Sequence, residues 1–410
     1  MQTLCLFEDR TVANFYPIAD TRHLSELLVG IETLRARASR RIPHDTLILH
    51  GRSFLDGQMR SPSIQSHTGR SPILFVNALC HVDDACATGL AADGEWIIRR
   101  NGRTVAARVG VERMRLLDME TGSSAFDTGL DLPERSTGEM VVHESIWDLI
   151  AANGETIVAD MDGCAYAIHG MVDPSVRIAH RDRVMIAAGA RIDPGAILDA
   201  TEGPVVIDKD ARVMHGAVLL GPVYIGAGTI VKVGAKIYPG TSIGPCSKVG
   251  GEVEGSIFIG YSNKQHDGFV GHSYLGTWVN LGADTNTSDL KNNYGTVRVS
   301  LQGREVDTGR MMLGSLIGDH VKTGINTMLN TGTVIGVGAS VFGAGFPPKE
   351  IPRFAWGGFE GGERYRIDQA IAVARTVMSR RGVAMTSTDE TLLRYLHGLG
   401  GNFGSTPSGA

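Results

Sequence analysis

A repeat of six residues runs through the middle of the chain and limits what it can fold into. Aliphatic residues stand at an unbroken spacing of six, and nearly every position four residues further on holds a small side chain. The aliphatic positions are Ile207, Val213, Leu219, Ile225, Val231, Ile237, Ile243 and Val249. Six residues correspond to one short strand and a corner, so three steps complete a triangular coil, and coils stack about 4.8 Å apart. The sequence therefore predicts a hexapeptide β-helix.

The same step of six occurs on both sides of this stretch. Earlier positions are Ile186, Ile192 and Leu198, and later ones are Ile317, Leu329, Ile335 and Val341. The 53 glycines agree with such a repeat, because glycine tolerates the positive φ angles of tight corners. We assign residues 166–358 to the β-helix. A solenoid has open ends and flat faces that need covering, so we expect oligomers.

The C-terminal segment, residues 359–398, is predicted to be helical. Its apolar residues between Ile367 and Met378 recur on one helical face, which suits a helix that covers the β-helix. The last residues, 399–410, end in GGNFGSTPSGA and are expected to be disordered.

Residues 1–165 do not repeat and are predicted to form a small α/β domain. TLCLF, TLILH and PILFVNA have the composition of buried strands, and EWIIRRNGRTVAARVG predicts a hairpin that turns at Asn101-Gly102. Apolar residues on one face predict a helix over 23–41. ESIWDLIAANG predicts another helix, which Gly154 closes.

Composition excludes several classes of partner. The net charge of −5 gives no electrostatic reason to expect nucleic acid. No apolar stretch reaches the 18 or so residues of a membrane span, so we expect no membrane association. The five cysteines show no metal-ligand spacing, which favours reduced thiols and a cytoplasmic location.

One stretch, GHSYLGTWVNLGADTNTSDLKNNYG (271–295), breaks the count of six. It resembles the family of bifunctional N-acetylglucosamine-1-phosphate uridyltransferase/glucosamine-1-phosphate acetyltransferase, and is closest to a branch named sugar nucleotidyltransferases. The resemblance extends to NFYPIADTRHLSELLVG near the start and to IGDHVKTGINTMLNTGTVIG later on. It implies a nucleotidyltransferase-like α/β domain, followed by a left-handed parallel β-helix that forms a homotrimer. The implied activity is acyl transfer from acetyl-CoA or another acyl-CoA to an amino sugar phosphate or nucleotide sugar.

The resemblance also implies individual site residues. GHSYLG resembles the family's GHLTYLG, which makes His272 the general base and Tyr274 a substrate contact. VNLGA resembles VNIGA and places Asn280 against the sugar, and NNYG resembles CNYDG. The remaining implied residues are Asn293 and Tyr294 in the substrate site, Lys291 on a phosphate, and Lys322 in the acyl-CoA cleft.

Residue chemistry supports these roles independently. N-acylation needs a neutral amine, and an imidazole with an ordinary pKa near 6.5 can take the proton of a sugar ammonium. Lysine supplies a point charge for phosphate, and the amides of Asn280 and Asn293 can hold hydroxyl groups. The alternatives are a surface histidine for His272, simple turn chemistry for Asn292 and Asn293, and solvated surface lysines for Lys291 and Lys322. His266 and His320 are further candidates near the cleft. We expect a loop over about 284–311 to leave the β-helix and reach a neighbouring subunit.

The N-terminal domain departs from the family pattern. Active nucleotidyltransferases carry a glycine-rich phosphate loop near the N-terminus, and this chain lacks those glycines. Only Arg22 is an evident phosphate contact. No metal site is expected, and magnesium would be needed only if this domain is active; the acidic candidates for it are Asp83, Asp84, Asp160 and Asp162. Three hypotheses remain: an acyltransferase, a sugar-1-phosphate nucleotidyltransferase with the β-helix as scaffold, and a non-catalytic assembly protein.

Overall fold

A computed structural model describes residues 2–59, 61–62, 64, 71–110, 113, 132–136, 140–357 and 362–399. Of the tail expected to be disordered, 399–410, only Leu399 is described, and residues 400–410 lie outside the described ranges. The chain forms two compact units. The N-terminal unit comprises Met1–Phe15, Thr21–Leu27 and Glu32–Ile146, and the β-helix unit comprises Tyr16–Asp20, Leu28–Ile31 and the chain from Trp147 onward.

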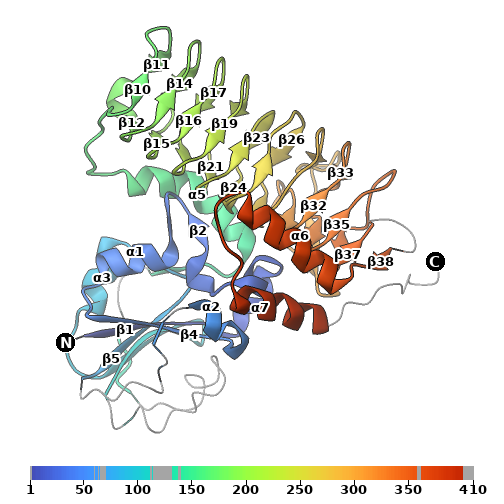
Figure 1. The fold of residues 1–410 in the computed structure, drawn as a ribbon. Coiled ribbons are helices and arrows are strands. Elements are labelled where there is room, and N and C mark those ends of the chain that lie inside the picture. The colour runs from blue at the N-terminus through green and yellow to red at the C-terminus, as the bar shows by residue number, and fades with distance from the viewer. Residues whose placement is uncertain are drawn as a thin grey trace. The chain divides into compact units, whose positions relative to one another are not determined.

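The β-helix unit is a prism with three faces of parallel strands, here called faces I, II and III (Figure 1). The chain visits the faces in the order II, III, I from Met171 to Ile335, and after Val341 it passes from face II to face I without a strand on face III. Face I contains β12 (Val184–Ile186), β15 (Val205–Ile207), β18 (Val223–Ile225), β21 (Thr241–Ile243), β24 (Ile257–Gly260), β27 (Tyr274–Thr277), β31 (Leu316–Ile317), β34 (Val334–Ile335) and β36 (Glu350–Ile351). Face II contains β10 (Met171–Val172), β13 (Arg191–Ile192), β16 (Arg212–Val213), β19 (Ile230–Val231), β22 (Lys248–Val249), β25 (Asn263–Lys264), β32 (Lys322–Thr323), β35 (Ser340–Val341) and β37 (Ala355–Trp356), with β38 (Glu363–Arg364) antiparallel at its end. Face III contains β11 (Arg177–Ala179), β14 (Ile197–Asp199), β17 (Val218–Leu220), β20 (Lys236–Ile237), β23 (Glu252–Glu254), β26 (Phe269–Gly271), β28 (Asn286–Thr287) and β33 (Met328–Leu329).

The repeated aliphatic residues fill the interior of this prism. All eight from Ile207 to Val249 are at most 1% exposed and belong to one continuous apolar cluster. Burying each such side chain contributes about 1.5–3 kcal/mol, so the column of aliphatic residues holds the coils together. The predicted hexapeptide β-helix is confirmed.

Three helices cover the β-helix unit. They are α5 (Ile146–Asp160), α6 (Ile367–Ser379) and α7 (Ser387–Gly398). In α6 the buried residues are those of the predicted apolar face: Ala370, Ile371, Ala374 and Met378. The segment after it turns and forms α7, which begins with a capping box between Thr386 and Asp389.

The prediction that Gly154 closes a helix is wrong, because α5 continues to Asp160. A Cβ atom at Gly154 would lie 3.3 Å from the Cα atom of Gly240 and 3.6 Å from a side-chain carbon of Pro222. The glycine therefore permits a close approach between the helix and a coil of the prism.

The N-terminal unit is built on a five-stranded sheet in the order β4-β1-β5-β8-β7. The strands are β1 (Thr3–Phe7), β4 (Thr46–His50), β5 (Ile73–Asn77), β7 (Trp96–Arg100) and β8 (Arg103–Val109). β1 pairs in parallel with β4 and β5, and β8 is antiparallel to both of its neighbours. The three predicted strands and the hairpin at Asn101-Gly102 are confirmed, and both turn residues have positive φ.

Shorter elements of both units complete the structure. Two further strands pair with each other, β6 (Cys80–His81) and β9 (Val141–Val142). The remaining elements are η1 (Arg10–Phe15), η2 (Ile18–Thr21), η3 (Leu24–Glu26), β2 (Leu28–Val29), β3 (Glu32–Thr33), α1 (Leu34–Arg41), η4 (Ser53–Leu55), α2 (Asp56–Met59), α3 (Asp84–Leu90) and η6 (Arg181–Arg183).

The predicted helix over 23–41 is wrong in its first half. Gly30 adopts a φ of 71°, which interrupts any helix, and α1 begins only after Thr33, whose hydroxyl accepts a hydrogen bond from the Ala36 amide. Leu28–Ile31 instead joins the β-helix unit. There the carbonyl of Leu28 accepts a hydrogen bond of 2.9 Å from the Tyr274 hydroxyl, so the apolar residues of this segment are buried as extended chain.

Candidate active site

A loop leaves the prism after β28, as the break in the count of six predicts. The departure is later than expected, because Asn286 and Thr287 still pair with the coils on either side. The segment between Thr287 and Leu316 contains an antiparallel hairpin of β29 (Arg298–Leu301) and β30 (Arg304–Asp307). Its two ends are joined by a bridge between Leu290 and Met312. This loop starts at the corner between faces III and I.

At the same corner His272 is paired with Asp289. The imidazole Nδ1 lies 2.7 Å from the Asp289 Oδ2, and the two side chains are 23% and 12% exposed. A carboxylate accepts only, so in the neutral imidazole Nδ1 carries the proton and Nε2 keeps its lone pair. No described residue forms a hydrogen bond with Nε2. The pair is therefore oriented for Nε2 to accept a proton from a ligand.

The corner has room for this pair because two neighbouring residues lack side chains. A Cβ atom at Gly271 would lie 2.2 Å from the Asp289 Oδ2, and one at Gly255 would lie 2.9 Å from the imidazole Nε2 and Cδ2. His272 itself has a φ of 40°, which is uncommon for a residue with a Cβ. Its amide donates to the Glu254 carbonyl and its carbonyl accepts from Gly314. These hydrogen bonds to the preceding and the following coil hold the backbone of His272 in place.

Asp289 was not among the residues predicted for the site. It follows β28, the face III strand that lies directly over β26, the strand before His272. Because the coil from 272 to 289 is close to three steps of six residues, a carboxylate there is expected at the same corner. The spacing of the coils was therefore the sequence feature that could have identified Asp289.

Three predicted residues lie just beyond Asp289 on the loop. The Lys291 ammonium donates to the Thr296 carbonyl, and the Asn293 Oδ1 accepts a hydrogen bond of 3.1 Å from the Gly295 amide. The Tyr294 side chain is 68% exposed. Asn293 thus shapes the turn through its side chain, and the loop presents Lys291 and Tyr294 at the surface.

Tyr274 is buried and does not face solvent at the candidate site. Its side chain is completely buried in β27, and its hydroxyl donates to the Leu28 carbonyl. A ligand cannot reach it, so Tyr274 has no part in the candidate site.

Asn280 and Lys322 lie together but on another face. Asn263, Asn280 and Lys322 pair in one ladder on face II, and the Asn263 Nδ2 donates to the Asn280 Oδ1 at 3.3 Å. Burial lowers the pKa of Lys322 to about 8, and its ammonium donates to the His320 carbonyl at 3.2 Å. Within one chain these two residues do not join the His272 corner.

A polar hollow lies at the corner between faces II and III, away from the His272 corner. It has a volume of about 380 Å³ and is lined by Lys232, Val233, Gly251, Gln265, His266, Asp267, Ala283 and Asp284. Next to it Lys264 is 2% exposed in β25, in register with the interior residue Val249, and its ammonium donates to the His266 carbonyl at 2.6 Å. Burial lowers the pKa of Lys264 to about 8, although Asp267 and Asp284 oppose this.

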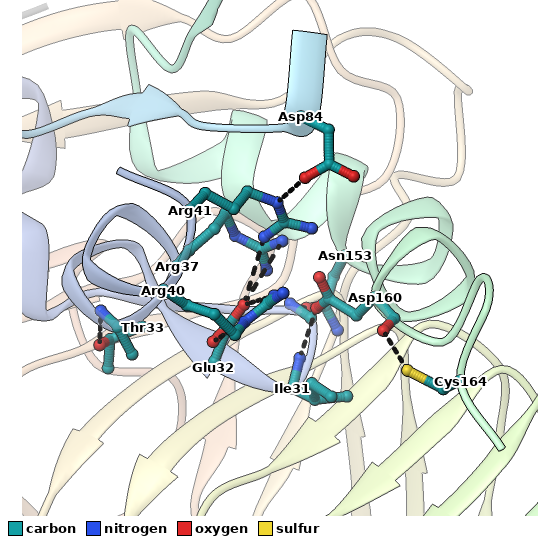
Figure 2. A network of polar contacts seen from close by, with 12 residues as sticks. Ile31, Glu32, Thr33, Arg37, Arg40, Arg41, Asp84, Asn153, Asp160 and Cys164 are labelled. Atoms are coloured by element: carbon teal, nitrogen blue, oxygen red, sulfur yellow. Dashed lines mark hydrogen bonds and ion pairs between the residues drawn. The ribbon is translucent and has the colours of Figure 1, made fainter. Parts of the chain in front are cut away.

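In the N-terminal unit Arg22 follows η2. Its carbonyl accepts a hydrogen bond of 2.8 Å from Arg52, which also binds the buried Glu8. Three of the four acidic candidates have structural partners. Asp83 caps α3 through the Cys86 amide. Asp84 pairs with Arg41, and Asp160 accepts from the Ile31 amide (Figure 2). Among the described residues, no three His, Cys, Asp or Glu side chains are grouped as metal ligands.

Fold and site together define a β-helix protein with a histidine–carboxylate pair at one corner of the prism. Residues 4–166 match the family model described as "Sugar nucleotidyl transferase". A bifunctional sugar-1-phosphate nucleotidylyltransferase/acetyltransferase of Sulfurisphaera tokodaii is 35% identical over 34% of this chain and 36% of that protein. The bifunctional protein GlmU of Methanococcus maripaludis is 38% identical over 21% of this chain and 20% of that protein. The matched part thus spans less than two thirds of either relative.

These matches support a relationship to GlmU-like proteins, in agreement with the sequence motifs. Among solved structures, a UDP-N-acetylglucosamine acyltransferase from Bacteroides fragilis aligns with 55% of this chain and 96% of its own, at 12% identity and a TM-score of 0.24. That likeness is too low to carry an argument about function. No helix among the described residues has the length and apolar composition needed to cross a membrane.

Proposed function

We propose that the protein is an acyltransferase that moves an acyl group from acyl-CoA, with acetyl-CoA as the first candidate, to the amine of an amino sugar phosphate or nucleotide sugar. The observation that carries the proposal is the His272–Asp289 pair. The amine attacks the thioester carbonyl and His272 Nε2 takes the amine proton. The C–S bond then breaks, and the imidazolium returns the proton to the departing CoA thiolate, which gives the amide, the CoA thiol and a neutral His272. Each step conserves atoms and electrons without a metal or redox cofactor.

Asp289 is a positioning residue in this proposal. It holds the Nδ1 proton, which fixes the tautomer with a basic Nε2 and stabilises the imidazolium that forms in the reaction. The two glycines around the pair keep both side chains in one arrangement. A preorganised base of this kind typically contributes about 10²- to 10⁴-fold to the rate.

The acceptor is proposed to lie between the loop and a neighbouring chain. Lys291 supplies a cation for phosphate, and Asn293 and Tyr294 stand beside it on the same loop. Asn280 and Lys322 lie on another face, so they can complete this site only from a second copy of the chain. A homotrimer with the site at its interfaces accounts for both sets of residues.

A second candidate function is sugar-1-phosphate nucleotidyl transfer, with the β-helix as a trimer scaffold. The match of residues 4–166 to a sugar nucleotidyl transferase model favours it. The missing glycine-rich loop speaks against it, because backbone amides of that loop bind the nucleotide phosphates in the family. The third hypothesis, a non-catalytic assembly protein, predicts neither activity.

Release of CoA thiol, measured over a panel of amino sugar phosphates and nucleotide sugars, tests the proposal. His272→Ala is expected to lower kcat about 10²- to 10⁴-fold with little change in KM. A higher pH should restore part of this activity, since more amine is then neutral. His266→Ala is the matched control, because His266 lines the polar hollow between faces II and III and not the His272 corner. Should His266→Ala abolish thiol release while His272→Ala retains it, the base is wrongly assigned; if no acceptor releases thiol, acyl transfer itself is wrong.

A further inference from the structure

Four positively charged side chains gather on face II of the β-helix unit, next to the end of α6. Lys248 belongs to β22, Lys232 follows β19, and Arg380 and Arg381 follow α6. We call these four residues the cationic cluster. The whole protein has a net charge of −5, so the cluster is a local feature and does not follow from the composition.

Hydrogen bonds between coils bring the cluster together. The Lys232 amide donates to the Val249 carbonyl at 2.7 Å, which places Lys232 on the coil beside Lys248. On the other side of Lys248, in the next coil, lies Asn263, and the Arg381 guanidinium donates to the Asn263 Oδ1. Lys232 and Arg381 thus flank Lys248.

No described carboxylate offsets these charges. The pKa of Lys248 is lowered first by burial and then by the positive charges of Arg381, Lys232 and Arg380. Among the described residues, no Asp or Glu side chain raises the pKa of Lys248 or forms an ion pair with a member of the cluster. The four charges therefore repel one another without a counterion from the described part of the chain.

Two of the four cations have an ordinary structural reason. Arg380 and Arg381 follow the C-terminus of α6, where positive charges interact favourably with the last carbonyl groups of a helix. Lys232 and Lys248 belong to coils of the prism, and this reason does not apply to them. Each adds positive charge where positive charge is already in excess, which is unfavourable unless an anion binds.

The cluster is open to a ligand from solution. Arg380 is exposed, and Lys232, Lys248 and Arg381 are half-buried. Lys232 also lines the polar hollow, whose volume of about 380 Å³ lies within the usual range of about 300–1,000 Å³ for ligand sites. Guanidinium and ammonium groups both bind phosphate. Four cations without a carboxylate suit several phosphate groups better than one.

We propose that the cationic cluster binds a small oligophosphate, a compound with two or more neighbouring phosphate groups. Lys248 lies at the centre of the site, Lys232 and Arg381 lie on either side of it, and Arg380 lies at the exposed edge. The bound anion removes the repulsion within the cluster and stabilises the end of α6 on the prism. The site is on face II, whereas His272 is at the corner between faces III and I. It is therefore separate from the proposed acyl transfer and does not depend on it.

Inorganic tripolyphosphate is a suitable probe, because it contains no sugar, nucleoside or thioester. Isothermal titration calorimetry of the full chain should show binding that weakens as NaCl is raised, because salt screens exposed charges. Lys248→Gln and Arg380→Gln should each weaken binding about three- to tenfold, and the double variant should weaken it more than either. Lys248→Arg keeps the charge and should retain most of the binding.

Thermal melting separates a binding role of Lys248 from a structural one. Without ligand, Lys248→Gln should melt at a higher temperature than the natural chain, because it removes one of the repelling charges. Tripolyphosphate should then raise the melting temperature of the natural chain more than that of the variant. A lysine that only stabilises the fold would give a variant with a lower melting temperature.

Two further variants are controls. Lys209→Gln removes an exposed lysine of the same unit outside the cluster, and His272→Ala removes the proposed base; both should bind tripolyphosphate as the natural chain does, whether or not acyl transfer is observed. The proposal is overturned by the absence of binding, or by binding that Lys248→Gln and Arg380→Gln weaken no more than Lys209→Gln. Displacement of tripolyphosphate by CoA at equal concentration would assign the cluster to the acyl donor and would also overturn it.

Discussion

The hydrogen bond between His272 and Asp289 gives a separate test of the catalytic pair. In Asp289→Asn the imidazole loses the negative charge that stabilises its protonated form, while the residue at 289 keeps its size. We expect kcat to fall about 10- to 100-fold, with KM changed less than about threefold and the melting temperature nearly unchanged. Steady-state kinetics of thiol release, together with thermal melting, measure all three. An unchanged kcat would remove Asp289 from the mechanism.

Lys264 makes stability depend on pH. Burial lowers its pKa from 10.5 to about 8 in the folded chain. Between these values the unfolded chain binds a proton that the folded chain does not, so the free energy of unfolding rises with pH over this range. Below pH 8 the full cost of burying the ammonium is present. Lys264→Met removes this cost and should stabilise the protein at pH 7 by about 1–3 kcal/mol.

Urea unfolding at several pH values measures the effect of Lys264→Met. The difference from the natural chain should shrink as the pH rises from 8 towards 10.5. Lys209→Met changes an exposed lysine and is the control. Equal differences at pH 7 and pH 10 would show that the Lys264 ammonium is not the cause.

Individual residues of the candidate site also show what could not be predicted from the sequence. His272 and the loop residues were proposed because the stretch that contains them interrupts the six-residue repeat and resembles a known family motif. Asp289 was missed because its role depends on which coil lies over which. Tyr274 was predicted as a ligand contact, although the segment that buries it comes from residues 28–31, about 245 positions earlier, a contact that no local pattern predicts.

One buried amide of helix α5 forms hydrogen bonds with the prism. Asn153 is completely buried; its Oδ1 accepts from the Gly30 amide at 2.7 Å, and its Nδ2 donates to the Gly240 carbonyl at 2.8 Å and to Ser242 at 2.9 Å. Asn153→Ala removes the side-chain partner of the Gly30 amide and of the Gly240 carbonyl. We expect a loss of about 2–4 kcal/mol of stability, read from urea unfolding. The neighbouring change Glu155→Ala, at an exposed position, should have no such effect; equal effects would show that the amide is unimportant.

Elements with a strong period were predicted well, and those governed by distant contacts were not. The β-helix and the buried face of α6 follow from spacing alone. The helix over 23–41 had the right apolar period, but Gly30 and the contacts of Leu28–Ile31 with the β-helix unit override it. Gly154 was predicted to end a helix from its residue type alone, whereas the structure shows that it allows Gly240 to pack closely against α5.

For the whole molecule we predict a homotrimer. The later coils expose large apolar side chains: Ile325 is 72% exposed, Phe346 is 55% exposed and Phe342 is 42% exposed. Large exposed apolar residues that lie together mark surfaces for association. Light scattering should give about three times the chain mass of 43.8 kDa. A stable species at the mass of one chain would contradict both the trimer and a site shared between chains.

The N-terminal unit is predicted to show weak or absent nucleotidyl transfer. Without the glycine-rich loop, few backbone amides are available for a triphosphate. Pyrophosphate release from UTP or dTTP with a sugar 1-phosphate and magnesium measures this activity. Release at a rate typical of the family would overturn the prediction, and Arg22→Ala should then abolish it.

The short segment Leu28–Ile31 has a consequence for how the chain is made. Its partners Asn153, Ser242 and Tyr274 leave the ribosome more than 120 residues later. The apolar side chains of this segment therefore stay exposed to solvent while most of the prism is still being translated. A fragment that ends before residue 242 lacks that cover altogether, and a fragment that starts after residue 31 leaves Tyr274 without its acceptor. Each unit is built from several separate segments of the chain, so no single truncation point yields both units complete.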